Sequence, residues 1–78
     1  MKKQEFCEKL QTALEISSVT LSEKTILKEI DEYDSMSVMG IIAFIDENFG
    51  VRLTANQLSS ITDIKSLMNL IGKEKFEA

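Results

Sequence analysis

An all-α bundle is the fold class that this 78-residue sequence predicts. The chain contains no proline and only three glycines, so little in it interrupts helices. Apolar residues recur at helical spacing in three segments, and a fourth, shorter segment is also helical in pattern. The length fits a single domain, residues 1–78, with one modest core. We therefore expect a four-helix bundle with three main helices, one short helix and a long loop between the first two.

The first helix is expected over residues 3–15, where Phe6, Leu10 and Leu14 recur at intervals of four. Residues 16–33 lose this pattern and are rich in Ser, Thr and β-branched residues, which predicts a long connection. Its apolar side chains are expected to tie it to the core: Val19, Leu21, Ile26 and Ile30. Loops of this length are uncommon and usually functional.

The second helix is expected from Ser35 to Phe49, with Gly50 adopting the positive φ that ends it. At about 100° per residue, one side of this helix is apolar and is expected to face the core. That side consists of Val38, Ile41, Ile42, Ile45 and Phe49. The opposite side, expected to face solvent, consists of Met36, Met39, Gly40, Ala43 and Glu47.

A short third helix is expected over residues 54–59, and Thr62 is expected to cap a fourth helix that ends at Gly72. Asp63 would then lie in the first turn of that helix, and the tail from Lys73 onward is expected to fray. The expected core consists of Phe6, Leu10, Leu14, Ile26, Ile30, Ile41, Ile45, Phe49, Leu58, Ile64, Leu67 and Ile71.

The negative charge is concentrated in residues 29–51, which hold six acids and no Lys or Arg. The acids are Glu29, Asp31, Glu32, Asp34, Asp46 and Glu47. This stretch therefore carries −6, while residues 1–28 and 52–78 carry +1 each. Nucleic-acid binding requires clustered Lys and Arg, so no nucleic-acid partner is expected. Protein partners with basic docking surfaces fit the charge better.

The single cysteine, Cys7, is expected to be a small apolar residue of the first helix, because it has no partner for an intrachain disulfide. Residues 1–5 are too polar for a signal peptide, and no apolar run approaches the ~18 residues of a membrane span. We therefore expect a cytoplasmic monomer without membrane insertion.

Met36 and Met39 are expected to form an exposed stripe that starts beside Ser35, with Asp46 and Glu47 on or next to it. Methionine side chains repack easily, so this stripe suits contact with several partners. Scattered exposed apolar side chains are also normal on any surface. We predict that these four residues bind partner proteins.

Asp34 and Ser35 stand at the start of the second helix, where either residue is a good N-cap. A serine in the first turn also holds its hydroxyl clear of the bundle, where a phosphodiester would meet the positive helix end. Asp34 would help a modifying enzyme to place a metal ion or a basic group there. The chain has no His to activate Ser35 or Cys7 and no Gly-rich phosphate loop, so an enzyme is not expected.

Three segments together resemble the acyl carrier protein family. They are Glu32-Tyr33-Asp34-Ser35-Met36, Phe49-Gly50-Val51 and Ile61-Thr62-Asp63-Ile64. The family has Asp-Ser-Leu at the start of its second helix and Phe-Gly-Ile at its end, and here Met36 and Val51 are conservative replacements. The resemblance covers residues 3–72, with the segments in the matching order.

The resemblance implies a four-helix carrier. Ser35 would receive 4′-phosphopantetheine from coenzyme A through a Mg-dependent holo-carrier synthase, a phosphopantetheinyl transferase, and Asp34 would support this modification. The thiol of the arm would hold an acyl group as a thioester and present it to the acyl-loading and acyl-using enzymes of fatty-acid or other lipid biosynthesis. Met36, Met39 and Glu47 occupy positions that the family uses for partner docking.

Several departures from the family's main carriers predict a specialised pathway. Glu32-Tyr33 replaces the Gly-Ala of the carriers of general fatty-acid synthesis and is similar to the Glu-Trp of specialised carriers. Those main carriers are also acidic at the positions of Ser37 and Gly40 and in the third helix, which here is neutral at residues 55–57. Two alternatives stay open: a stand-alone aminoacyl carrier of the peptidyl or D-alanyl type, and an unmodified helical adaptor.

Overall fold

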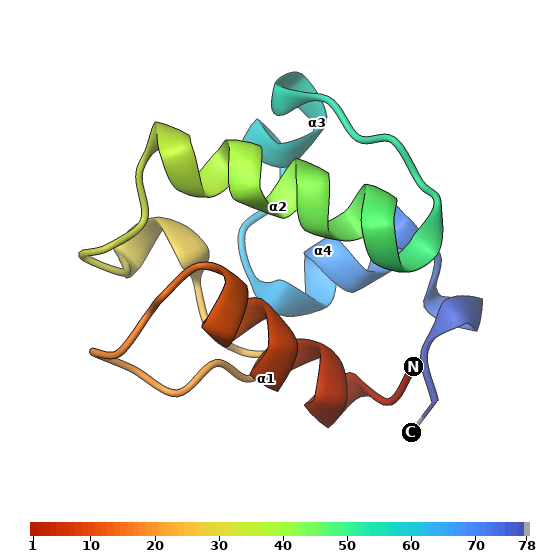
Figure 1. Cartoon of the computed structure of the whole chain (residues 1–78), viewed down its shortest axis with the longest axis horizontal. Helices are drawn as coiled ribbons and strands as arrows, with labels where there is room; N and C mark the ends of the chain where they lie inside the picture. The colour runs from red at the N-terminus through yellow and green to blue at the C-terminus, as the bar shows by residue number, and fades with distance from the viewer. Residues whose placement is uncertain (78) are drawn as a thin grey trace.

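Four α-helices and two short 3₁₀ turns make up the structure, a computed structural model that describes residues 1–77 (Figure 1). The α-helices are α1 (Lys3–Ala13), α2 (Ser35–Phe49), α3 (Ala55–Ser59) and α4 (Ile64–Ile71), and the 3₁₀ turns are η1 (Leu27–Glu29) and η2 (Lys73–Lys75). No strand occurs in residues 1–77. The predicted all-α fold, with three longer helices, one short helix and a long loop after the first, is confirmed.

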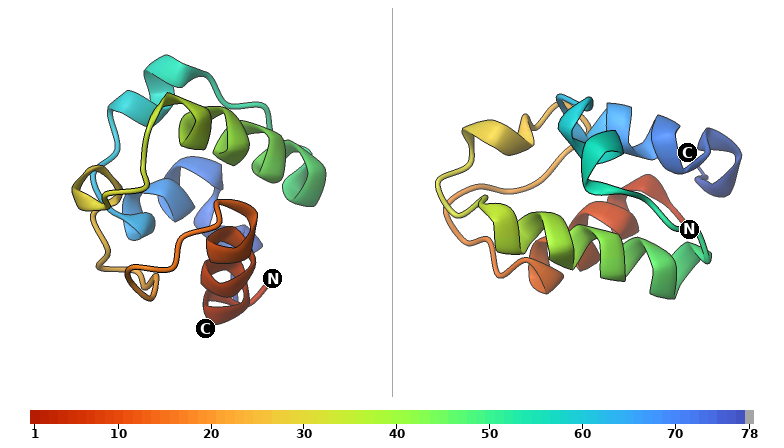
Figure 2. Two further views of the ribbon diagram at one scale, coloured as in Figure 1. Left: turned by 60° about the vertical axis from the view of Figure 1, so that its left-hand side comes forward. Right: turned by 90° about the horizontal axis from the view of Figure 1, so that it is seen from above.

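The start of α2 and the two chain ends lie at opposite ends of the molecule (Figures 1 and 2). The connection from α1 to α2 passes back alongside α1, where Glu23 lies 3.1 Å from the Lys3 ammonium, and then leads through η1 to the start of α2. The short helix α3 lies beside α2. The residues around Ser35 therefore form a surface of their own, away from the paired termini.

A group of four phenylalanine rings joins α1, α2 and the end of the chain. Phe6 is fully buried at its centre. The Phe6 ring centroid lies 5.8 Å from that of Phe44, 5.9 Å from that of Phe49 and 5.1 Å from that of Phe76. Such edge-on and tilted pairs add about 0.5–1.5 kcal/mol each beyond the area that they bury.

Nine of the twelve predicted core side chains are buried, and Leu14 and Phe49 are half-buried against the core. The prediction that Ile26 belongs to the core is wrong, because this side chain is 40% exposed. The backbone of Ile26 pairs with that of Asp63 in an isolated bridge, and Leu27 turns into the core in its place. Buried side chains outside the twelve predicted ones include Ile16, Leu27, Phe44, Leu53, Ile61 and Phe76.

The first half of the long connection is held by one glutamine of α1. The Gln11 side-chain amide donates to the carbonyls of Ile16 at 3.2 Å and Val19 at 2.9 Å, and its oxygen accepts from the Leu21 N–H at 3.0 Å. Leu21 is buried as predicted. Val19 is 40% exposed, so the prediction that its side chain ties the loop to the core is wrong, and its carbonyl makes the contact instead.

Two helix ends differ from the prediction. α1 ends at Ala13 rather than at residue 15, because Glu15 adopts a left-handed φ of 56°. Asp63 rather than Thr62 is the N-cap of α4, and its carboxylate accepts a hydrogen bond from the Ser66 N–H at 2.8 Å. An aspartate here satisfies a free N–H of the first turn and adds a negative charge at the positive helix end.

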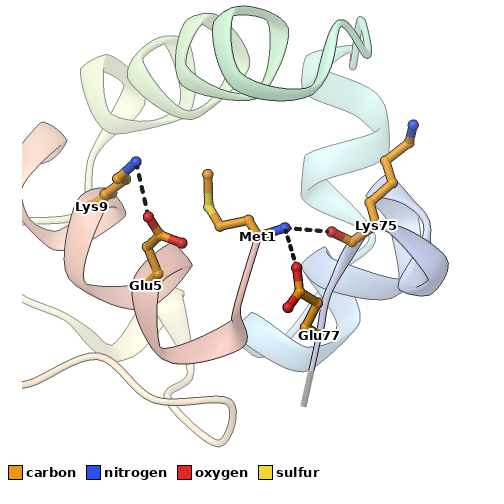
Figure 3. A network of polar contacts seen from close by, with 5 residues as sticks. All are labelled: Met1, Glu5, Lys9, Lys75 and Glu77. Carbon is orange, nitrogen blue, oxygen red and sulfur yellow. Dashed lines mark hydrogen bonds and ion pairs between the residues drawn. The ribbon is translucent and has the colours of Figure 1, made fainter.

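The expectation that the tail frays from Lys73 is wrong for the residues that the structure describes. η2 turns the chain back, and Phe76 is buried. The Glu77 N–H donates to the Met1 carbonyl at 2.9 Å, and the Glu77 carbonyl accepts from the Lys3 N–H at 3.2 Å. The Met1 ammonium donates to the Lys75 carbonyl at 3.1 Å and lies 3.9 Å from a Glu77 carboxylate oxygen (Figure 3).

Replacing Phe76 with alanine is therefore expected to lower the free energy of unfolding by about 3 kcal/mol, because the ring is buried against Phe6 and Phe49. Urea unfolding followed by circular dichroism measures the change. Lys75→Ala is the matched control: its exposed side chain should contribute within about 0.5 kcal/mol. Equal stability of Phe76→Ala and Lys75→Ala would show that the tail does not complete the core.

Candidate functional site

A reciprocal capping box fixes the first residue of α2. The Asp34 carboxylate accepts from the Ser37 N–H at 3.0 Å, and the Ser37 hydroxyl oxygen accepts from the Asp34 N–H at 3.2 Å. The same hydroxyl lies 3.2 Å from the Glu32 carbonyl, to which it donates. Asp34 is therefore the N-cap, and Ser35 is the first helical residue.

Ser37 is buried, and its hydroxyl completes this cap. From the sequence, Ser37 was noted only as a neutral residue at a position where the main carriers are acidic. The spacing of Asp34 and Ser37 is that of a capping box, with a serine in place of the usual Glu or Gln. Asp34 could therefore have been predicted as the N-cap from this spacing.

Ser35 is exposed, and its hydroxyl has no hydrogen-bond partner within residues 1–77. The neighbouring Met36 side chain is 80% exposed, so nothing on that side covers the hydroxyl. The Ser35 hydroxyl is thus accessible and makes no hydrogen bond within residues 1–77. The chain contains no histidine that could act as a base for this hydroxyl.

The predicted partner surface is solvent-facing as expected. Met36 is 80% and Met39 65% exposed, and Asp46 and Glu47 are exposed near the other end of α2. Gly40 differs from the prediction, because it is half-buried. A Cβ on Gly40 would lie 3.2 Å from a methyl of Leu14, so the turn that follows α1 passes close to α2 at this position.

The acids near the end of α2 do not serve the stability of the helix. Asp46 and Glu47 lie close to the negative end of the helix dipole, while the first turn of the helix itself contains no acid. Neither carboxylate has a cationic group within 4.0 Å in residues 1–77.

Glu32 ties the chain just before Ser35 to the start of the long connection. Its carboxylate accepts hydrogen bonds from the backbone N–H groups of Ser17 at 3.0 Å and Ser18 at 3.1 Å, and from the Ser18 hydroxyl. These bonds, with that of the Ser18 hydroxyl foremost, lower the Glu32 pKa from 4.5 to about 2. Burial raises the pKa of the adjacent, half-buried Tyr33.

A hollow with a volume of about 380 Å³ lies beside Ser35, between η1, α2 and α3. Its wall is mostly apolar and includes Val38, Met39 and Leu58. Lys28 closes one side, where its ammonium donates to the Ser59 carbonyl at 3.0 Å. The hollow is thus a mostly apolar space with the Lys28 ammonium and the Ser35 hydroxyl at its rim.

Elsewhere in residues 1–77, a second hollow and the single cysteine lie apart from Ser35. A larger hollow, about 540 Å³, lies between α1 and residues 20–24, and no residue of α2 lines it. Cys7 in its wall is buried, and this burial raises the pKa of its thiol. Within residues 1–77 no three His, Cys, Asp or Glu side chains are placed to hold a metal ion. None of the helices described is both long and apolar enough to cross a membrane.

The fold is that of an acyl carrier protein. The chain superposes on the solution NMR structure of a holo acyl carrier protein from Geobacter metallireducens with a TM-score of 0.73, covering 96% of this chain and 87% of the other. The two sequences are 20% identical, and at this level the likeness establishes the fold. No protein-family model and no curated protein sequence matches the chain.

Glu32→Gln is expected to destabilise the protein most at neutral pH. A carboxyl group whose pKa falls from 4.5 to about 2 on folding contributes its full stabilisation above pH 4.5, and this contribution is lost as the pH falls toward 2. The difference in the free energy of unfolding between wild type and Glu32→Gln should therefore shrink across that range in urea titrations. Glu29→Gln, an exposed neighbour, serves as the control. A difference that stays constant down to about pH 2 would contradict the assigned pKa.

Proposed function

We propose that this chain is a carrier that holds acyl groups on a 4′-phosphopantetheine arm attached to Ser35, in a specialised pathway rather than general fatty-acid synthesis. The observation that carries the proposal is the accessible, uncommitted hydroxyl of Ser35 at the first position of α2 in an acyl carrier fold. The Asp34-Ser35-Met36 sequence at that position supports the same attachment point.

The residues at the start of α2 fit the arm. The Ser35 oxygen would bond to the phosphorus next to the pantetheine unit of coenzyme A, while the pyrophosphate P–O bond breaks and the adenosine bisphosphate leaves. The hydroxyl proton passes to a base of the synthase or to solvent. The positive end of α2 favours the resulting phosphodiester. When bound, the arm supplies a thiol that holds the cargo as a thioester.

Asp34 would have two roles in this proposal. Its Oδ1 atom is occupied by Ser37 in the capping box, whereas its Oδ2 atom makes no hydrogen bond within residues 1–77. The free oxygen points to a contact with the Mg²⁺ ion or a basic group of the synthase during attachment. Asp34 would thus place Ser35 and also support its modification.

The proposed partners are the holo-carrier synthase and the acyl-loading and acyl-using enzymes of one pathway, meeting a monomeric carrier in the cytoplasm. Met36, Met39, Asp46 and Glu47 would form their docking surface, with apolar contact near Ser35 and acidic contact toward the end of α2. α3 presents no acid, which supports a partner set different from that of the main fatty-acid carriers.

Attachment at Ser35 is tested by intact mass. Incubation with coenzyme A, Mg²⁺ and a broad-specificity phosphopantetheinyl transferase is expected to add one phosphopantetheine per chain, and Ser35→Ala is expected to abolish the gain. Ser59→Ala, which removes another exposed hydroxyl at the same hollow, should be modified like the wild type. No gain in the wild type would favour an unmodified adaptor. Loading of the holo form by an amino-acid-adenylating enzyme would favour the aminoacyl carrier.

Asp34→Asn in the same assay separates the two roles of Asp34. Asparagine is as good an N-cap as aspartate, so the stability of the helix should be retained. Modification should nevertheless slow, because the carboxylate charge is lost. Asp34→Ala should lower both the rate and the free energy of unfolding, the latter by about 1 kcal/mol. A rate that follows stability alone in this pair would leave Asp34 as a cap only.

Docking is expected to depend on the acidic end of α2. Reversing Asp46 and Glu47 to lysine should slow modification by a basic synthase, and added salt should slow modification of the wild type, since surface charges act mainly on association rates. The helix should not lose stability, because lysine suits the negative end of the dipole. Asn56→Lys on neutral α3 is the control, whereas Gln57 is unsuitable because its side chain accepts from the Thr54 N–H in the α3 cap. Rates insensitive to salt and to the reversals would place the docking surface elsewhere.

A further inference from the structure

Lys28 is held across the hollow beside Ser35 by a contact with a distant part of the chain. It belongs to η1, and its ammonium donates to the Ser59 carbonyl at the last residue of α3, 31 positions away. The carbonyl end of a helix attracts a cation, which accounts for the position of the ammonium. The Lys28 side chain thus links η1 to α3 at the rim of the hollow.

The charge environment of Lys28 is unusual. Among residues 1–77 it is the only charged residue that lines the hollow, and residues 29–51, which follow it, contain no Lys or Arg. No carboxylate lies within 4.0 Å of its ammonium in residues 1–77, although Glu29 and Asp31 are close in sequence. The Ser59 carbonyl uses one of the three N–H donors of the ammonium. Two donors therefore remain for an anion.

A phosphodiester on Ser35 would add a negative charge to a segment that already carries −6. The helix end offsets part of this charge, but the dipole acts only over the first turn. Lys28 and Ser35 line the same hollow, and the four-carbon stem of a lysine lets its ammonium follow a nearby anion. Lys28 is therefore well placed to neutralise the added charge.

We propose that Lys28 is a positioning residue that pairs with the phosphodiester on Ser35 and directs the attached arm toward the hollow between η1, α2 and α3. The inference rests on the proposed attachment at Ser35. In this arrangement the ammonium keeps its bond to the Ser59 carbonyl and donates to a phosphate oxygen as well. The apolar wall, including Val38, Met39 and Leu58, then lies next to the arm instead of open solvent.

Phosphorus-31 and proton NMR of the holo protein test the pairing. Attachment is first verified by intact mass for the wild type, Lys28→Gln, Lys28→Arg and the control Lys24→Gln, in which an exposed lysine outside the hollow is changed. The wild type is expected to show a phosphorus resonance displaced from that of a phosphopantetheinylated serine peptide. It should also show a nuclear Overhauser effect between the Lys28 ε-methylene and the arm methylene next to the phosphate.

Lys28→Gln should return the phosphorus resonance toward that of the peptide, as should high salt in the wild type. Lys28→Arg should retain most of the displacement, and Lys24→Gln all of it. Circular dichroism confirms that each variant is folded. Failure to form any holo protein would defeat the proposed function itself. A holo protein that lacks the Overhauser effect, or whose phosphorus resonance is unchanged in Lys28→Gln, would overturn only the role of Lys28.

Discussion

The position of Ser35 depends on where α2 begins, and the hydrogen bonds between Asp34 and Ser37 determine that residue. A start one residue earlier or later would leave the exposed face of α2 unchanged but would alter which backbone groups surround the Ser35 hydroxyl. Burial of Ser37 and its bond to the Glu32 carbonyl make such a shift costly. The accessibility of Ser35 is therefore a property of a hydrogen-bonded helix end.

The connection before α2 is anchored near both of its ends by side-chain hydrogen bonds. The Gln11 side chain bonds the first half of the connection to α1. The Glu32 carboxylate bonds its last residues to the backbone of Ser17 and Ser18. η1 itself is anchored by the Leu27 N–H, which donates to the Thr62 carbonyl at 3.3 Å, and Lys28 reaches α3 from it. A long segment without a main helix can in this way present fixed side chains beside Ser35.

The spacing of apolar residues along the chain was enough to predict the main helices and the exposed Met36 and Met39. The solvent-facing position of Ser35 followed from its place in the first turn of α2. Periodicity failed where the decisive contact is distant in sequence. Phe76 is buried by rings from α1 and α2, and Ile26 is turned outward by backbone pairing with Asp63. The bond from Lys28 to Ser59 is of the same kind, so only the folded chain reveals the cation beside Ser35.

Four exposed residues of α2 lie outside the buried core: Met36, Met39, Asp46 and Glu47. Met36 and Met39 leave large apolar side chains in water, and Asp46 and Glu47 oppose the helix dipole without a cation near them in residues 1–77. A small domain is only marginally stable. Residues whose placement does not stabilise the fold are therefore expected mainly at functional surfaces. Their concentration on the solvent face of one helix agrees with the docking surface proposed above. Lys28 and Ser35 line the same hollow, so under the proposed function the two charge features would serve different steps: the acids would act in the encounter with partners, and Lys28 would place the arm.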